Sequence, residues 1–409
     1  MSETSADKPR PQALEFEEAR RIVIETVRPL AHAPKTELVP LEEAYGRILA
    51  EAVHAERDYP ALERSLRDGY AVKAKDLPAT LAIRGEVRAG DEAQSPLRDG
   101  EALEIMTGAP VPAGADAVVM VEHAHRIGDK VKIEQSAEAG QFINKRGAEA
   151  RSGDELIPAR TRLDASHIAI LATMGRILVP VFVKPRVAIL ATGDEIVGLS
   201  EQPGPHQIRN SNSHMLAALV RITGGEPTIL PVARDTKEAL IPLLKEGLAY
   251  DCLIVTGGVS AGKYDLVKPA LRELGVDFRF ERLRIQPGQP TAFGVANAKP
   301  VFGLPGNPGS SLITYHLFAR PALELIAGAA DVALPLLTAR FAAPFRHKGG
   351  LTRFLPARLS DDGHLHLRHI SWQGSSDIPA LAKANCFLVA DHDRESWAVG
   401  DSIRVMFKA

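Results

Sequence analysis

The feature that most constrains this chain is a glycine-rich stretch, residues 256–265, which lies between an apolar run and a helical pattern. The apolar run, residues 252–255, has the length and composition of a buried strand. The stretch contains three glycines, Gly257, Gly258 and Gly262. Glycines at a strand end let backbone N–H groups approach an anionic ligand, while Asp265 at the helix entrance can hold a metal ion. This pattern is typical of a phosphate or pyrophosphate site.

Two more apolar runs end in similar loops. Residues 186–191 lead into Thr192 and Gly193, and residues 300–304 lead into the Pro-Gly-Asn-Pro segment 305–308. The carboxyl ends of parallel strands converge on one crevice. Three glycine-rich strand ends therefore predict one composite site.

Strands and helices alternate between residues 184 and 328, which is the pattern of a doubly wound parallel sheet. Strands are expected near residues 187–191, 228–232, 252–256 and 301–304. Helices are expected near residues 212–222, 236–248, 265–274 and 310–326.

The other segments differ in pattern. Apolar residues at helical spacing predict helices over residues 16–30, 41–49 and 163–175. Short strands broken by Gly, Pro and Asp fill residues 60–153, and short strands return after residue 328. We therefore expect an α/β multidomain protein with four units. They are a split α+β domain at 14–58 and 154–183, a β-rich inserted domain at 59–153, an α/β domain at 184–330 and a C-terminal β-barrel-like domain at 331–409.

Charge and hydropathy argue against some classes of function. The formal net charge of the 409-residue chain is -2, so nothing points to nucleic acid or to an anionic membrane surface. Residues 1–12 are polar and lack the apolar core of a secretory signal, and no later apolar run approaches a membrane span. We therefore expect a cytoplasmic protein.

Several segments along the chain match, in order, the motifs of one known family. They are residues 64–71, 105–110, 146–149, 192–195, 257–265, 286–290, 305–308 and 373–375. From about residue 14 to 407 the chain resembles the MoeA-type molybdopterin molybdenumtransferases, a family that includes the E-domain of gephyrin. Motifs in the same order are far more specific than any one of them.

The resemblance implies an elongated four-domain homodimer with a MogA-like α/β domain. Such an enzyme takes adenylylated molybdopterin, inserts molybdate into its dithiolene and releases AMP, with Mg²⁺ as the divalent cation. A molybdopterin adenylyltransferase could be a partner chain that delivers the adenylylated pterin.

The residues of this chain suit parts of that reaction. Cleavage of a phosphoanhydride needs a metal on the bridging oxygens and little covalent chemistry from the protein. Glu195, Asp235 and Asp265 follow strands of the expected sheet, where carboxylates could bind Mg²⁺. By resemblance, Asp68 and Thr107 complete the cleft from the second subunit, and these five residues are the catalytic candidates. The loops expected to hold the pterin and phosphates contain Thr192, Gly193, Gly257, Gly258, Ser260, Gly262, Pro305, Gly306, Asn307 and Pro308.

Each candidate also has a purely structural explanation. A glycine-rich loop after a strand can be a tight turn, and Asp235 or Asp265 can be a helix N-cap. Glu195 can be a solvated residue that favours the helix dipole. Asp68 and Thr107 are each followed by glycine, so both can belong to turns.

The chain departs from the family pattern at the expected molybdate pocket. Two lysines of the family correspond to Gln286 and Gln289, and an arginine corresponds to Pro356, unless a slip of the register brings Arg353 or Arg358 there. Each charge-assisted hydrogen bond that is lost is worth about 1.5–3 kcal/mol when desolvated, so oxyanion binding should weaken. By resemblance, the oxyanion candidates are Gln286, Gln289, Ser310, Arg353 and Ser375 or Ser376.

Two functions of different classes remain at this point. In the first, the chain is a working molybdenumtransferase with an altered oxyanion site. In the second, it is a divergent non-catalytic paralogue that binds molybdopterin as a carrier, scaffold or regulator. The carboxylates and glycine loops favour the enzyme, whereas the missing cations favour the paralogue. We expect the enzyme, because loss of function should also have removed the carboxylates of the metal site.

Overall fold

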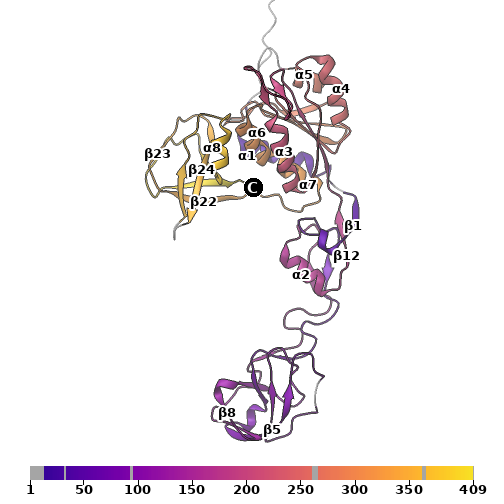
Figure 1. The fold of residues 1–409 in the computed structure, drawn as a ribbon, viewed down its shortest axis with the longest axis vertical. Coiled ribbons are helices and arrows are strands. Elements are labelled where there is room, and N and C mark those ends of the chain that lie inside the picture. Colours follow the sequence, from indigo (N-terminus) through magenta and orange to yellow (C-terminus); the bar gives the residue numbers. More distant parts are fainter. Residues whose placement is uncertain (1–12, 32–33, 93–94, 260–265, 362–364, 409) are drawn as a thin grey trace, which may run out of the picture.

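The computed structural model describes residues 13–31, 34–92, 95–259, 266–361 and 365–408. The molecule is elongated (Figure 1). One end holds an α/β body with a C-terminal barrel beside it, and a stalk leads from the body to a β-rich distal unit at the other end. Among the described residues, no helix has the length and apolar character needed to cross a membrane.

A six-stranded sheet forms the centre of the α/β body, in the order β16-β13-β17-β21-β20-β18. The first four strands are parallel, and β20 and β18 are antiparallel to their neighbours. The bounds are β13 (Arg186–Ala191), β16 (Glu226–Ile229), β17 (Cys252–Thr256), β18 (Asp277–Phe280), β20 (Ala292–Ala296) and β21 (Lys299–Leu304). Two short parallel strands, β14 (Ile196–Val197) and β15 (Ile208–Arg209), extend from the loop after β13.

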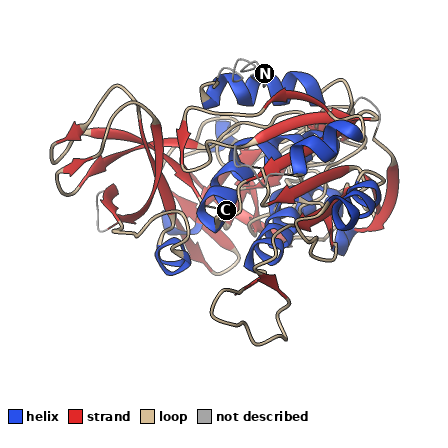
Figure 2. Cartoon of the chain, turned by 90° about the horizontal axis from the view of Figure 1, so that it is seen from above, coloured by secondary structure: helices blue, strands red, loops and turns tan. Residues whose placement is uncertain are grey.

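Helices pack on both faces of this sheet. Along β17, Cys252 and Ile254 pack with α3, α6 and α7, whereas Leu253 and Val255 pack with α4 and α5. A strand that is apolar on both sides suits a parallel sheet covered by helices on two faces. The bounds are α3 (Ser211–Thr223), α4 (Lys237–Gly247), α5 (Val267–Glu273), α6 (Pro308–Thr314), the π-helical turn η4 (Tyr315–Ala319) and α7 (Arg320–Ile326). Figure 2 shows this helix-rich body beside the barrel, which consists mainly of strands.

The first helix, α1 (Phe16–Val27), packs on the α/β body. Its buried face, Phe16, Ala19, Val23 and Val27, has helical spacing and joins the same apolar core as η4 and α7. The Phe16 ring also meets Phe354 of the barrel edge-on, with 5.2 Å between centroids. We expected this helix to pack within the split N-terminal domain. The sequence pattern predicts the helix but not the partner on which it packs.

The stalk is built from segments on both sides of the inserted residues. β1 (Thr36–Pro40) pairs with β12 (Leu178–Phe182), and β2 (Val53–His54) pairs with β11 (Glu155–Ile157). Helix α2 (Ala165–Thr173) starts at Asp164, whose carboxylate accepts hydrogen bonds from two backbone N–H groups. The short helix expected at 41–49 is only a 3-10 turn, η1 (Leu41–Glu43), because Ile48 and Leu49 form β-bridges to Arg162 and Val181.

The distal unit contains a six-stranded sheet in the order β7-β4-β6-β5-β9-β8. Its strands are β4 (Gly69–Val72), β5 (Ala79–Val87), β6 (Glu101–Ile105), β7 (Ala117–Met120), β8 (Ala124–Ile127) and β9 (Lys130–Ile133). The shorter elements are β3 (Arg64–Ser65), η2 (Ala74–Asp76), η3 (Val121–His123) and β10 (Ile143–Asn144). Where the chain enters and leaves the unit, Tyr59 and Ala150 exchange two backbone hydrogen bonds of 2.7 and 3.1 Å.

In the barrel, the strands β24, β25, β22, β28 and β26 pair in a closed ring, and β19 adds to β24. The strands are β19 (Ile285–Gln286), β22 (Leu336–Phe341), β24 (Thr352–Asp361), β25 (Leu365–His369), β26 (Cys386–Ala390) and β28 (Ser402–Phe407). The remaining elements are β23 (Phe345–Arg346), β27 (Ser396–Trp397) and α8 (Ile378–Lys383). Ring closure leaves none of these five strands with an unpaired side.

Candidate active site

A cavity of about 520 Å³ opens where β13, β17 and β21 end. All three strand-end loops that the sequence singled out contribute to its wall. The predicted residues that line it are Thr192, Gly193, Glu195, Asp235, Gly257, Gly258, Pro305, Gly306, Asn307, Pro308 and Ser310. The convergence expected of parallel strands is therefore present, and it concentrates these side chains in one place.

The glycines after β17 have a geometric role. Gly257 and Gly258 have φ values of 94° and 58°, in the left-handed region that glycine adopts without strain. A Cβ atom on Gly257 would lie 2.5 Å from the backbone oxygen of Thr192, and one on Gly258 would lie 2.7 Å from a methyl carbon of Val267. Only glycine lets the backbone of this loop lie so close to its neighbours along the cavity wall.

Two buried polar atoms at the cavity have no protein partner among the described residues, Thr192 Oγ1 and Asn212 Oδ1. Both belong to residues that line the cavity. The amide nitrogen of Asn212 donates to Thr256 Oγ1 at 2.9 Å and to the Gly306 backbone oxygen at 2.6 Å. Because a buried polar atom without a partner costs about 1–3 kcal/mol, these two atoms are suited to a ligand that supplies the missing hydrogen bonds.

Helix α3 also contributes to the site, although the local sequence pattern does not predict it. The segment before and at the start of this helix, Arg209, Asn210, Ser211 and Asn212, lines the cavity. Asn210 caps the helix by accepting from the Ser213 backbone N–H at 3.1 Å. The run Asn-Ser-Asn-Ser at 210–213 is typical of a helix N-cap, which by itself predicts no contact with a ligand. Its position just after the short strand β15, at the same edge of the sheet, was the signal for a second role.

Two of the three predicted metal ligands lie in the described residues. Glu195 and Asp235 follow neighbouring segments of the sheet edge, and both line the cavity. The third, Asp265, lies outside the described residues, as do Ser260 and Gly262. Within the described ranges, no cluster of three or more His, Cys, Asp or Glu side chains is close enough to hold a metal ion.

The predicted oxyanion residues lie around α6, whose first turn lines the cavity. Ser310 is buried in α6, and Pro290 lines the cavity just after Gln289. A Cβ on Gly288 would lie 2.6 Å from the Thr314 methyl group, so the 286–290 loop packs directly on this helix. The Ser375 hydroxyl accepts a 2.9 Å hydrogen bond from the Asn307 amide, which brings the barrel to the same helix.

Gln286 and Arg353 are neighbours in the parallel pair β19–β24. Gln286 is exposed, and Arg353 Nε is buried without a hydrogen-bond partner in the described residues. Neither residue lines the cavity. Pro356 is a buried residue of β24, opposite Phe387 of β26. The arginine that lies beside the glutamine loop is therefore Arg353, whereas position 356, where the family pattern predicts an arginine, faces Phe387.

Asp68 and Thr107 pair with each other in the distal unit. The Thr107 backbone N–H and hydroxyl donate to Asp68 Oδ1 at 2.6 and 2.8 Å. These two hydrogen bonds hold the pKa of Asp68 below its usual value, so the carboxylate stays charged near neutral pH. Asp68 immediately precedes β4, and the sheet containing β4 lies at the opposite end of the molecule from the α/β body (Figure 1). Within one chain, the pair is therefore separated from the cavity.

Fold and site together define a multidomain α/β protein with a ligand cavity at the carboxyl ends of its parallel strands. Family models match three consecutive parts of the chain. The model described as "MoeA N-terminal region (domain I and II)" matches residues 14–175, "Probable molybdopterin binding domain" matches 188–325, and "MoeA C-terminal region (domain IV)" matches 338–408.

Individual relatives agree with these models. The chain is 37% identical over 320 residues to the molybdopterin molybdenumtransferase of Nostoc sp., a match that covers 76% of this chain and 73% of the relative. It is 33% identical over 404 residues to the enzyme of the same name from Bacillus subtilis, covering 94% and 93%. The crystal structure of the molybdopterin biosynthesis MoeA protein from Pyrococcus horikoshii OT3 superposes with a TM-score of 0.81 at 28% identity, covering 97% of this chain and all of that one.

The chain belongs to the MoeA family of molybdopterin molybdenumtransferases. The predicted family and multidomain α/β fold are confirmed. Membership also establishes the enzyme class and the general process, molybdenum cofactor biosynthesis.

Proposed function

We propose that the chain binds adenylylated molybdopterin in the cavity at the end of the parallel sheet, inserts molybdate into it and releases AMP. The observation that carries this proposal is the cavity itself, with its two unpartnered polar atoms, Thr192 Oγ1 and Asn212 Oδ1. The glycines at 257 and 258 expose backbone to a phosphate group, and Thr192, Gly193 and residues 305–308 supply the rest of the wall.

Glu195 and Asp235, together with Asp265, would hold Mg²⁺ in this reaction. The fit rests on their chemistry, because carboxylate oxygens are hard ligands and two of them share the cavity wall. Mg²⁺ bound there supplies charge neutralisation for a phosphoanhydride. The contribution of the chain is to orient the anhydride through backbone and hydroxyl donors.

For the molybdate, we propose a site beside α6 that is formed by Gln286, Gln289, Ser310, Arg353 and Ser375, of which Ser310 also lines the cavity. Glutamine amides and serine hydroxyls donate hydrogen bonds to an oxyanion, and Arg353 adds the positive charge. The Arg353 Nε atom without a partner is the specific feature of this chain that favours the assignment.

A homodimer would complete the cleft. Asp68 and Thr107 are preorganised by their mutual hydrogen bonds, yet they lie in the distal unit and far from the cavity of their own chain. A second copy that places its distal unit over the cavity would bring the pair to the substrate. We further propose a cytoplasmic enzyme that receives its adenylylated substrate from a molybdopterin adenylyltransferase.

Release of AMP from adenylylated molybdopterin tests the function directly. We expect release to depend on both molybdate and Mg²⁺, and to fall sharply in Glu195→Gln and Asp235→Asn. Tight pterin binding without molybdate-dependent release would instead support the non-catalytic carrier. Retention of full activity in both carboxylate variants would show that these residues serve only the local structure of the sheet edge.

A further inference from the structure

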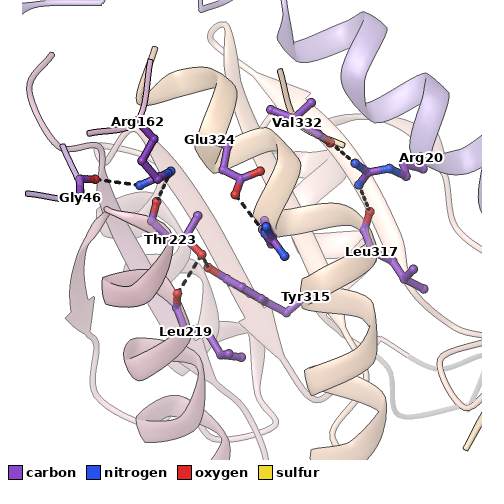
Figure 3. Close-up of polar contacts among 10 residues, drawn as sticks. Arg20, Gly46, Arg162, Leu219, Thr223, Tyr315, Leu317, Glu324 and Val332 are labelled. Carbon is purple, nitrogen blue, oxygen red and sulfur yellow. Dashed lines mark hydrogen bonds and ion pairs between the residues drawn. The ribbon is translucent and has the colours of Figure 1, made fainter. Parts of the chain in front are cut away.

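One side chain, Arg162, connects the stalk to the α/β body (Figure 3). Its backbone is held in the stalk, where Arg162 forms a β-bridge with Ile48 and its Nη1 donates to the Gly46 backbone oxygen at 2.9 Å. Its Nη2 donates at 3.1 Å to the backbone oxygen of Thr223, the last residue of α3. The guanidinium group therefore bridges two carbonyl oxygens, one on each side of the junction.

The far side of this bridge is rigid. The Thr223 hydroxyl donates to the Leu219 backbone oxygen at 2.9 Å and lies 2.8 Å from the Tyr315 hydroxyl, and all of these atoms are buried. Because the Thr223 proton goes to Leu219, Tyr315 donates to Thr223. Figure 3 shows the contact of Thr223 with Leu219 within α3 and its contact with Tyr315 of η4.

The same helix, α3, also reaches the cavity at its other end. Asn212 in its first turn bonds Thr256 and Gly306 and keeps one oxygen unpartnered at the cavity wall. A single straight element thus joins the Arg162 bridge to the proposed substrate site. The orientation of the stalk relative to α3 is also its orientation relative to the cavity.

Arginine suits this position better than other residues. Its planar fork donates in two fixed directions at once, whereas lysine offers a single, freely rotating point charge. The site is partly buried, and burial lowers the pKa of Arg162 without removing its charge. A second arginine, Arg160, also crosses the junction, but its contact to the Gly328 backbone oxygen is longer, at 3.3 Å.

We propose that Arg162 is a positioning residue for the reaction, because it fixes the angle between the stalk and α3. That angle determines where the Asp68–Thr107 pair of the distal unit lies relative to the active-site cleft of a second copy. The inference rests on the proposed function, because it assigns Arg162 a role through Asp68. Arg162 itself touches no substrate. Its effect is on geometry, and misplacement of a catalytic group by about 1 Å can cost on the order of a hundredfold in rate.

The kinetic test combines Arg162→Gln with Asp68→Ala. We expect Arg162→Gln to reduce kcat for AMP release by about tenfold to a hundredfold while leaving the affinity for adenylylated molybdopterin unchanged, since the cavity residues stay in place. In the Asp68→Ala background the same substitution should have little further effect. Arg162→Lys should restore part of the rate. Arg221→Gln is the matched control, because Arg221 lines the same surface pocket at the junction as Arg162 and the described residues give its side chain no hydrogen-bond partner.

A second measurement does not depend on activity. Spin labels at Lys130→Cys in the distal unit and Glu238→Cys on α4 report the distance between the two ends, and the native Cys252 and Cys386 are buried. Labelled chain diluted with unlabelled chain should give one narrow distance distribution, which broadens in Arg162→Gln and stays narrow in Arg221→Gln.

The inference is wrong if Arg162→Gln leaves kcat unchanged, or if its effect on kcat multiplies with that of Asp68→Ala. It is also wrong if Arg162→Gln lowers the affinity for adenylylated molybdopterin as much as it lowers kcat. An unchanged distance distribution would overturn it as well. If the unsubstituted protein releases no AMP in response to molybdate, the proposed function fails instead, and the distance distribution alone decides whether Arg162 fixes the stalk.

Discussion

At the scale of single residues, removal of the unpartnered Thr192 hydroxyl should affect the stability of the protein and the binding of its substrate in opposite directions. Thr192→Val keeps the shape of the side chain and removes a buried hydroxyl that has no partner among the described residues. The free protein should be as stable as before or more stable by about 1 kcal/mol, since no hydrogen bond is lost. Binding of adenylylated molybdopterin should weaken by about tenfold.

Denaturant unfolding and calorimetric titration measure the two effects of Thr192→Val. Thr223→Val is the contrasting variant, because that buried hydroxyl has two partners and its removal should destabilise the fold by about 1–3 kcal/mol. If Thr192→Val lowers stability as Thr223→Val does, the hydroxyl has a structural partner and is not available to a ligand.

The glutamines of the 286–290 loop lead to a prediction about molybdate. If the proposed molybdate site is correct, replacement of Gln286 and Gln289 by lysine places two charges next to the dianion, and Gln286 is the neighbour of Arg353. The double variant should reach half-maximal AMP release at about tenfold less molybdate, and the gain should shrink as salt is raised. Pterin affinity should change little. A flat molybdate dependence, with folding and pterin binding intact, would place these glutamines outside the oxyanion site.

At the scale of elements, the start of the β17 loop tolerates little change in its backbone path. Gly257→Ala forces a Cβ to within 2.5 Å of a backbone oxygen and requires a φ of 94°, so it should destabilise the protein by several kcal/mol or collapse the cavity. Gly275→Ala is a matched control, with a φ of 84° and open space around the new methyl group. Equal unfolding free energies for the two variants would contradict the packing argument.

The π-helical turn η4 contains a histidine that should make the protein acid-sensitive. His316 is buried with both ring nitrogens unpartnered, and burial, with Arg320 and Lys408 nearby, lowers its pKa from 6.5 to about 4. Since the unfolded chain binds the proton more readily, stability should fall as pH drops from about 6.5 to about 4, by roughly 2–4 kcal/mol, and then level off for this group.

Unfolding experiments at a series of pH values check the role of His316. His316→Leu should remove this component of the pH dependence, whereas replacement of the exposed His392 by glutamine should retain it. An unchanged pH profile in His316→Leu would assign the acid sensitivity to other groups.

The sequence predicted elements more reliably than their partners. The alternation of strands and helices from 186 to 326 and the cavity at the strand ends follow from local patterns, because buried strands and glycine turns have strong local signatures. Residues 41–49 were wrongly expected to be a helix, since Ile48 and Leu49 form β-bridges to Arg162 and Val181, both more than a hundred residues away. The long helix expected at 310–326 contains the π-helical turn η4, which no local signal marks.

In the candidate site, too, the sequence predicts the local loops but not the contacts between distant residues. Three loops could be placed in one crevice because the topology of a parallel sheet dictates it. The role of Asn212 depends on its distance to Thr256 and Gly306, which sequence spacing does not encode. The assigned roles of the site residues and the four-unit domain boundaries stay predictions.

At the scale of the whole molecule, the separation of the Asp68–Thr107 pair from the cavity leads to a test by complementation. Mixing an Asp68→Ala chain with a Glu195→Gln chain should restore part of the activity, because one of the two clefts in a heterodimer then has both residues intact. The measurement is AMP release after confirmed subunit exchange. No recovery would mean that one chain supplies both residues to its own cleft.

The paired backbone bonds between Tyr59 and Ala150 have a further consequence for the architecture. The chain leaves the stalk and returns to it at two adjacent points. Residues 60–149 therefore form an inserted unit whose ends are about one strand spacing apart. A two- or three-residue bridge could close that gap at little entropic cost. A chain without this inserted unit, or with a different one, would keep the residues that line the cavity, so this position suits the exchange of a whole domain.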